Sequence, residues 1–183
     1  MQNKPQKMKT MSDVQNLANE DAIEKLRDLI EHTRIAILCS NLTSIPFSCC
    51  PMATQKVDED TGVIWFFTTV TNKHVHEISV DKRVQLIYAD NSNSSYLTLF
   101  GAAEISDDRQ KLAELWNPDA KVWFQDGIDD PKLRLLKVTP SDGLYWDTKN
   151  GKMVSFLKRM TSLVTGQTMD DSIEGSLTVK NNF

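Results

Sequence analysis

The sequence predicts a mainly β fold of the α+β class, in which an antiparallel barrel is flanked by helices. Two observations lead to this prediction. Six or seven short apolar, strand-like runs follow one another through mostly short connections. Helical patterns stand at both ends of the chain and between these runs, without the regular strand–helix alternation that is typical of a parallel sheet.

The individual elements follow from the spacing of apolar residues. Helical spacing predicts helices at residues 20–32, from 72 or 73 to 79, at 108–116 and at 153–164. Asn19 and Asp107 are the expected N-caps of the helices at 20–32 and 108–116. Strands are predicted at residues 35–40, 47–57, 63–70, 83–89, 95–105, 133–139 and 143–147.

Length and composition bound the organisation of the chain and its partners. The 183 residues fit one domain at 19–165, with a flexible N-terminal tail at 1–18 and a C-terminal tail at 166–183. A net charge of -4 argues against nucleic acid or an anionic membrane as partner. The longest apolar runs are far shorter than the roughly 20 residues that span a bilayer. Because there are only three cysteines and no secretory signal, we expect a cytoplasmic location.

Several common catalytic motifs do not occur in the sequence. The seven glycines are spaced too widely for a Gly-rich phosphate loop, and there is no G-x-S-x-G motif. We expect no metal site: His74 and His76 are interpreted as surface polar residues, and Cys49 and Cys50 as ordinary strand residues. Catalytic residues are not identifiable, so any chemistry would depend on a bound cofactor.

The most informative segment is the strand end at residues 68–73, Thr-Thr-Val-Thr-Asn-Lys. A helix N-terminus offers unpaired N–H donors to an anion, and the Thr68, Thr69 and Thr71 hydroxyls with the Lys73 ammonium would add further donors. The spacing alone favours a plainer interpretation, in which Asn72 caps the helix and the threonines are present because β-branched residues favour strands. Both interpretations, a phosphate site and a helix cap, fit the residues.

Aromatic residues give a second, weaker indication of a ligand site. Trp116, Trp123, Phe124, Trp146 and Tyr96 could provide stacking or edge contacts to a planar ligand. Each is more often a core residue than a ligand contact. Trp123 is the best candidate among them because turn residues flank it on both sides.

Several short motifs occur in an order that is typical of one family. They are Pro-Met-Ala-Thr at 51–54, Ile-Trp-Phe-Phe-Thr-Thr at 64–69, Asn-Lys at 72–73, Tyr-Leu-Thr-Leu-Phe-Gly at 96–101, Trp-Asn-Pro at 116–118 and Tyr-Trp-Asp at 145–147. Over residues 22–147 the chain resembles the pyridoxamine 5′-phosphate oxidase-like flavin-binding split barrels, and most closely their general stress protein 26 branch. The resemblance implies a six-stranded antiparallel split β-barrel with flanking helices. It also implies a homodimer that holds FMN in a cleft between subunits.

The resemblance also implies positions for the cofactor-binding residues. By position in the family motifs, they are Cys50, Pro51, Met52, Ala53, Phe67, Thr68, Thr69, Asn72, Lys73, Ser95, Tyr96 and Trp123. Residues 51–53 would line the flavin ring, 67–69 would follow the ribityl chain and 72–73 would meet the phosphate. Ser95 and Tyr96 would reach the ring from the other subunit. With the resemblance added, the phosphate site becomes our interpretation of Lys73.

Departures from the family pattern argue against one activity of the family. Relatives place Arg where this chain has Cys50, and the true oxidases carry a Lys near Gln55 and a C-terminal Arg-containing segment that is not found here. Oxidation of vitamin B6 phosphates is therefore disfavoured. Two hypotheses follow: a flavin-dependent oxidoreductase of unassigned substrate, or a non-enzymatic flavin- or ligand-binding stress-response module of the same fold. A deazaflavin- or haem-binding relative is a third.

Overall fold

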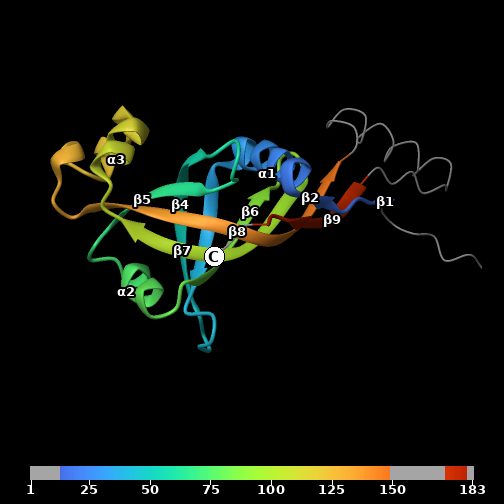
Figure 1. Ribbon diagram of the computed structural model, residues 1–183, viewed down its shortest axis with the longest axis horizontal. Coiled ribbons are helices and arrows are strands. Elements are labelled where there is room, and N and C mark those ends of the chain that lie inside the picture. The colour runs from blue at the N-terminus through green and yellow to red at the C-terminus, as the bar shows by residue number, and fades with distance from the viewer. Residues whose placement is uncertain (1–12, 149–171, 181–183) are drawn as a thin grey trace, which may run out of the picture.

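Six antiparallel strands close into a barrel, which confirms the predicted fold (Figure 1). The computed structural model describes residues 13–148 and 172–180. The barrel strands are β3 (Ile35–Ser40), β4 (Ser48–Val57), β5 (Ile64–Thr69), β6 (Arg83–Asp90), β7 (Ser95–Ser106) and β8 (Leu133–Thr148). They lie in the order β8–β5–β4–β3–β6–β7, and the pairing of β7 with β8 closes the ring.

One long strand, β8, replaces the two strands predicted at 133–139 and 143–147, so this part of the prediction is wrong. Proline lacks an N–H and usually interrupts a central strand, which is why the pattern seemed to break near Pro140. The pairing instead shifts register: Gly101 pairs with Pro140, whereas Phe100 pairs with Asp142. This bulge absorbs Ser141 and lets β8 continue for 16 residues.

The two segments that the sequence assigns to terminal tails add strands beside the barrel. β1 (Asp13–Val14) and β2 (Leu17–Ala18) run parallel to β9 (Ser172–Thr178), which pairs antiparallel with the second half of β8. The approach is close, since a Cβ built on Gly175 would lie 1.8 Å from the Gln15 carbonyl oxygen. Two-residue strands carry no readable periodicity, so the sequence pattern does not predict this pairing.

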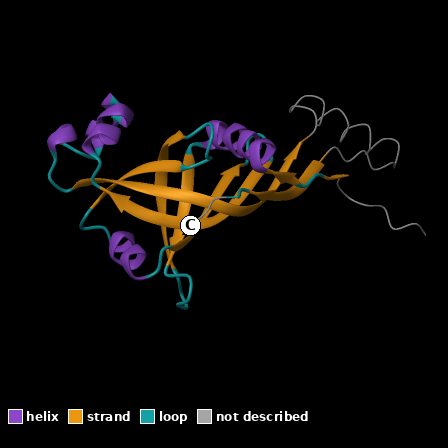
Figure 2. Cartoon of the chain, viewed as in Figure 1, coloured by secondary structure: helices purple, strands orange, loops and turns teal. Residues whose placement is uncertain are grey.

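Three α-helices lie around the barrel in the described part of the chain (Figure 2). α1 (Asn19–Thr33), α2 (Lys73–Val80) and α3 (Arg109–Leu115) fall close to the predicted ranges. The helix predicted at 153–164 lies outside the described residues.

The N-caps of α1 and α3 differ from the prediction. Asn19 is the first residue of α1 and has φ 52°, while Ala18 occupies the cap position, where no side chain bonds to the helix. In α3 the cap is Asp108 rather than Asp107, because the Asp108 carboxylate accepts a hydrogen bond from the Lys111 N–H at 2.9 Å.

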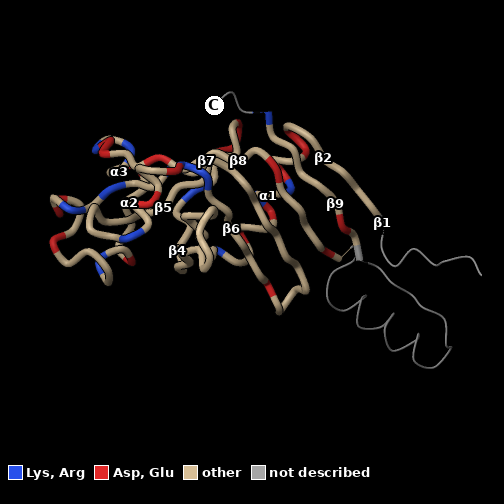
Figure 3. The backbone as a smooth tube through the Cα atoms, turned by 90° about the horizontal axis from the view of Figure 1, so that it is seen from below, with Lys and Arg blue, Asp and Glu red and all other residues tan. Residues whose placement is uncertain are grey.

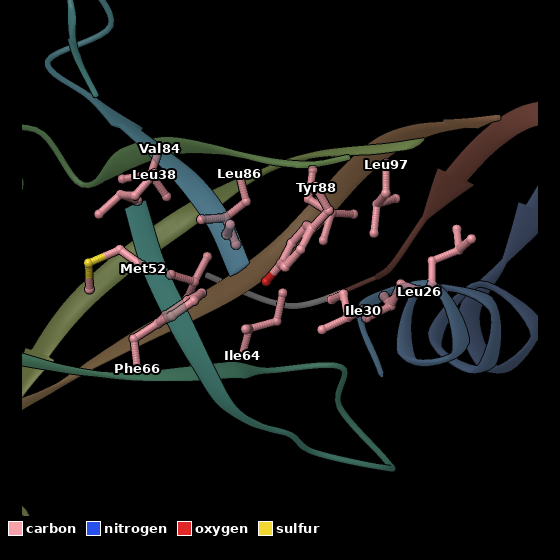
Figure 4. Close-up of a cluster of buried hydrophobic side chains, with 14 of the residues drawn as sticks. Leu26, Ile30, Leu38, Met52, Ile64, Phe66, Val84, Leu86, Tyr88 and Leu97 are labelled. Atoms are coloured by element: carbon pink, nitrogen blue, oxygen red, sulfur yellow. The ribbon is translucent and has the colours of Figure 1, made fainter. Parts of the chain in front are cut away.

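The main hydrophobic core fills the barrel and extends beneath α1. Figure 4 shows side chains from several elements meeting there, including Leu26 and Ile30 of α1 and Leu38, Phe66 and Leu86 of the barrel. These five side chains are essentially removed from solvent. Burying a side chain of this size stabilises the fold by roughly 1.5–3 kcal/mol.

A second, smaller core lies under α3 and the first half of β8. It consists of Leu112, Leu115, Ala120, Phe124, Leu133 and Leu135. Phe67, Trp65 and Trp116 pack against it while remaining partly exposed. This core therefore fixes the segment that follows α3 against the end of β5.

Close packing at the β8 bulge predicts a large cost for a small substitution. A Cβ on Gly101 would lie 2.3 Å from the Thr139 carbonyl oxygen and 3.0 Å from the Pro140 Cα, both backbone atoms. We expect Gly101→Ala to lower the free energy of unfolding by about 2–3 kcal/mol. Urea denaturation would measure this.

Gly127→Ala is the matched control, because a Cβ there would meet nothing within 4 Å and only the positive φ of 72° opposes it. The control should cost about 1 kcal/mol. Equal losses in the two variants would contradict the close approach at the bulge.

Candidate functional site

A cavity of about 430 Å³ lies where β4 and β5 meet the start of α2. It is lined by Ile35, Pro51, Met52, Ala53, Phe67, Thr68, Thr69, Asn72, Trp123 and Phe124. None of the described residues that line it carries a charge. Its size falls in the range of small-molecule sites, roughly 300–1,000 Å³.

The apolar part of the cavity results from the alternation of outward and inward side chains along β4. Pro51 and Ala53 point outward and are exposed, whereas Met52 between them is buried in the barrel core. Pro51 pairs with Ile37 and Ala53 with Ile35 on β3. An open apolar wall two strands wide results.

An aromatic cluster forms the opposite wall. The Phe67 ring centroid lies 5.7 Å from that of Trp116 and 6.0 Å from that of Phe124, in tilted and edge-on geometry. The 3-10 helix η1 (Pro118–Val122) follows α3 and leads to Trp123, which stands at the rim with 80% of its surface exposed. A planar ligand in the cavity would cover much of that ring.

Hydroxyl and amide groups form the polar end of the cavity, where β5 ends and α2 begins. Asn72 occupies the N-cap position of α2, but its side chain does not cap the helix. Its amide instead donates to the Thr68 hydroxyl at 3.1 Å, and the hydroxyl oxygens of Thr69 and Thr71 lie 3.1 Å apart. The Val75 N–H donates to the Asn72 carbonyl at 3.0 Å, but no side chain caps α2, so the other N–H groups of its first turn remain available to an anion.

His74 is buried at this junction, so its interpretation as a surface residue is wrong. Only 7% of its surface is exposed. Its Nε2 lies 2.8 Å from the Thr68 hydroxyl oxygen, and its Nδ1 lies 3.5 Å from the Cys50 sulfur. Burial lowers the pKa of His74, while the nearby Glu77 carboxylate opposes this shift. The Thr68 hydroxyl is thus held between His74 and Asn72 and positions both.

The position of His74 was readable from the helical pattern. His74 and Ile78 stand four residues apart on α2 and are the buried residues of that helix. A helix that buries Ile78 therefore places His74 on the same buried face.

Lys73 lies beside the cavity and does not line it. Its ammonium donates to the Ser48 hydroxyl at 2.8 Å and lies 3.2 Å from the Glu77 carboxylate. Ser40 and Ser48 each donate to Glu77 at 2.6 Å. Although burial opposes it, these bonds and Lys73 hold the pKa of Glu77 below its usual value. Since 79% of the Lys73 side chain is exposed, it has room to turn toward the cavity.

Most of the predicted cofactor-binding residues line this one cavity: Pro51, Met52, Ala53, Phe67, Thr68, Thr69, Asn72 and Trp123. Cys50 points into the barrel side of β4, toward His74, and burial raises the pKa of its thiol. Phe124, one of the aromatic candidates, also lines the cavity, as does Ile35, which was not predicted. The alternation of exposed and buried side chains along β3 is the signal that would have indicated Ile35 as an outward-facing residue beside the cavity.

Ser95 and Tyr96 lie at the start of β7, away from the cavity of their own chain. The Ser95 hydroxyl donates to the Asp147 carboxylate at 2.8 Å, and the Tyr96 hydroxyl donates to the Asn91 side chain at 3.1 Å. Their expected role, from a second subunit, stays a prediction.

Residues 21–170 match the model of the family described as pyridoxamine 5′-phosphate oxidase like. The chain belongs to this family. The resemblance expected from the motif order is thereby confirmed.

Members of the general stress protein 26 branch are among the relatives of this family member. General stress protein 26 of Bacillus subtilis (strain 168) is 23% identical over 126 residues, which cover 67% of this chain and 86% of that protein. A solved structure described as a general stress protein 26 from Jannaschia sp. CCS1 is 29% identical, with a TM-score of 0.73, and covers 86% of this chain and 98% of its own.

The general stress FMN/FAD binding protein from Xanthomonas citri shares the fold of this family member. It is 23% identical with a TM-score of 0.62, and the match covers 72% of this chain and 92% of that one.

Residues 13–148 and 172–180 contain neither a cluster of metal ligands nor a membrane-spanning helix. Within these ranges, no group of three or more His, Cys, Asp or Glu side chains could hold a metal ion. None of the helices in the same ranges is long and apolar enough to cross a membrane.

Burial of His74 predicts how stability depends on pH. Its pKa in the folded chain lies below the ordinary value of 6.5, so below pH 6.5 the unfolded chain binds a proton that the folded chain does not. The free energy of unfolding should therefore fall as pH decreases from 6.5 toward the folded-state pKa. In His74→Gln this part of the dependence should disappear, as measured by urea midpoints between pH 7 and 5.

His32→Gln serves as control, because the pKa of the exposed His32 is raised by its bond with the Asp28 carbonyl and its linkage has the opposite sign. An unchanged pH slope in His74→Gln would refute the assignment of this dependence to His74.

Proposed function

We propose that the cavity binds FMN. The observation that carries this proposal is the form of the cavity, an open apolar slot that ends at an uncapped helix N-terminus. Its volume and neutral lining suit an aromatic ring system, and the Thr69, Thr71 and Asn72 groups suit a phosphate. The Xanthomonas citri relative, described as FMN/FAD binding, supports the same ligand class.

Each part of the cavity has a distinct role in this proposal. Pro51 and Ala53 would contact one edge of the ring, and Trp123 would cover it from the rim. Phe67 and Thr69 would lie along the ribityl chain. At the far end, Lys73 would leave Glu77 and bind the phosphate.

The basic residues of the true oxidases have no equivalent in the described part of the cavity. Gln55, near the position of their additional Lys, donates to the Ala53 carbonyl at 2.9 Å and accepts from the Asn117 amide at 2.8 Å. Cys50 is turned toward His74. Lys73 is therefore the cation on which phosphate binding would depend.

A flavin would supply hydride and electron transfer, so the protein is proposed to be a flavin-dependent oxidoreductase of unassigned substrate. In that role the described residues bind and orient the ring rather than transfer protons. The alternative is a non-enzymatic flavin- or ligand-binding module of the same fold. A cytoplasmic location stays part of the proposal in both cases.

A homodimer completes the proposal, and one face of the barrel supports it. Exposed apolar side chains form this apolar barrel face: Ile35, Ile37, Ile87, Tyr96, Phe100, Leu144 and Trp146. Ile37 pairs with Ile87, Ile87 with Thr98 and Thr98 with Leu144, so the face runs across four strands. Charged residues gather instead on α1, around α2 and α3 and near strand ends (Figure 3).

The apolar barrel face and the cavity share Ile35. A second copy on this face would border the cavity and could bring Ser95 and Tyr96 toward it. A contiguous apolar surface of this kind marks an interaction site more often than ordinary solvent-exposed surface.

The role of Lys73 predicts a selective loss of phosphate affinity. We expect Lys73→Ala to weaken FMN binding about tenfold to a hundredfold, the size of a charged hydrogen bond of about 1.5–3 kcal/mol, while riboflavin affinity stays unchanged. Flavin fluorescence titrations with both ligands would measure this.

Lys82→Ala is the control, since Lys82 is paired with Glu104 at 2.8 Å and is not among the cavity residues. Equal weakening of FMN and riboflavin by Lys73→Ala would contradict the phosphate assignment. If FMN binds to the native chain but no electron donor reduces it, the binding-module alternative replaces the oxidoreductase.

The dimer predicts a second selective effect. Leu144→Lys places a charge on the apolar barrel face and should raise the dimer dissociation constant at least about tenfold, because the charge would be desolvated in the interface. Sedimentation velocity over a concentration series would show the change. Val80→Lys, on the exposed end of α2, should leave the dimer intact. A monomeric native chain would refute the homodimer itself.

A further inference from the structure

Two cysteines face each other across the β3–β4 pair. Cys39 and Cys49 are direct register partners, and their sulfur atoms lie 3.5 Å apart. Both point to the same side of the sheet as Ile37 and Pro51, since residues two apart on a strand share a face.

The backbone hydrogen-bonding pattern between β3 and β4 brings the side chains of Cys39 and Cys49 close together. The Thr54 N–H donates to the Arg34 carbonyl at 2.8 Å, which marks a hydrogen-bonded site. Sites alternate along an antiparallel pair, so Cys39 and Cys49, five residues along, occupy a non-hydrogen-bonded site. Pro51, two residues from Cys49, fits this assignment because it has no N–H to donate.

A disulfide is compatible with this geometry. Facing residues at a non-hydrogen-bonded site have Cα atoms roughly 4.5 Å apart, and disulfides span roughly 4.4–6.8 Å between Cα atoms. Side-chain rotation alone can therefore bring the two sulfur atoms to bonding distance, without a change in strand register.

The two thiols differ in their access to solvent. Cys39 is 1% exposed, and burial together with its contact with Cys49 raises the pKa of its thiol to about 12. Cys49 is exposed. An oxidant from solution therefore meets Cys49 first, and Cys39 is held behind it as the second thiol. Cys50 points to the other side of β4, against His74, and takes no part.

From this arrangement, we propose that Cys39 and Cys49 form a peroxide-oxidisable dithiol, a modification site that closes to an intrachain disulfide. The Cys49 thiol loses its proton and its sulfur attacks hydrogen peroxide. The O–O bond breaks, Cys49 becomes a sulfenic acid and the departing hydroxide takes a proton to give water.

In the second step the Cys39 sulfur attacks the Cys49 sulfur. The S–O bond breaks, and the hydroxide leaves with the Cys39 proton as a second water. Overall, two thiols are oxidised to one disulfide and one peroxide is reduced to two waters. The step requires no flavin, so it stands independently of the proposed cofactor.

The experiment counts free thiols in the folded full-length chain before and after treatment with hydrogen peroxide. The native chain has three cysteines and should lose two free thiols, which a dithiol reductant restores. Peptide mapping under non-reducing conditions should show the cross-link between Cys39 and Cys49. Cys50→Ser, the matched control, should also lose two thiols and give the same cross-link.

Cys39→Ser should give no intrachain disulfide and should accumulate a sulfenic acid on Cys49, detectable with a dimedone-type probe. Retention of all three thiols in the native chain would overturn the proposal. A cross-link between chains, or one that involves Cys50, would overturn it equally.

Discussion

The pairing of β8 with three other strands holds the structure together. Along its length β8 pairs with β7, which closes the barrel, while its first half pairs with β5 and its second half with β9. The bulge at Gly101 and Pro140 makes this possible, because it absorbs one residue without ending the strand. Without that shift the first half and the second half of β8 could not both remain in register with β7.

The cavity depends on this strand as well. Leu133 and Leu135 of β8 lie in the core beneath α3, and Phe67 on β5 packs against that core. The same packing places Phe124, and beside it Trp123, at the mouth of the cavity. The position of β5 also fixes the position of Thr68. The hydrogen bonds of the Thr68 hydroxyl with His74 and Asn72 then orient the start of α2. Barrel closure and site geometry therefore share one set of contacts.

The sequence predicted the strands and helices well because most of them bury one face, and burial leaves a period of two or 3.6. It failed at Pro140, where a local rule about proline was overridden by a bulge formed with a distant strand. It also failed for residues 13–18, whose partner β9 lies more than 150 residues away.

For the site, the sequence pattern alone could not choose between a helix cap and a phosphate site at Asn72. In the structure the Asn72 amide turns to Thr68, a choice that depends on His74, which packs behind it. His74 was misread because it was judged as a single histidine, without its spacing of four residues from the buried Ile78 on α2. The apolar half of the site was predicted from the order of the family motifs. Alternation along a strand shows which side chains are exposed, but it cannot show whether an exposed apolar surface binds a ligand.

The segment Cys49–Ala53 contributes both to the cavity wall and to the proposed dithiol. Its outward positions are Cys49, Pro51 and Ala53, and its inward positions, Cys50 and Met52, pack toward the core. Residues two apart on a strand lie about 7 Å apart, so the Cys49 thiol and the cavity wall are near neighbours on one face. Both also face β3, through Cys39 for the thiol and Ile35 for the wall. The register of β3 on β4 thus fixes the cavity wall and the dithiol together, and a slip of one residue would remove both.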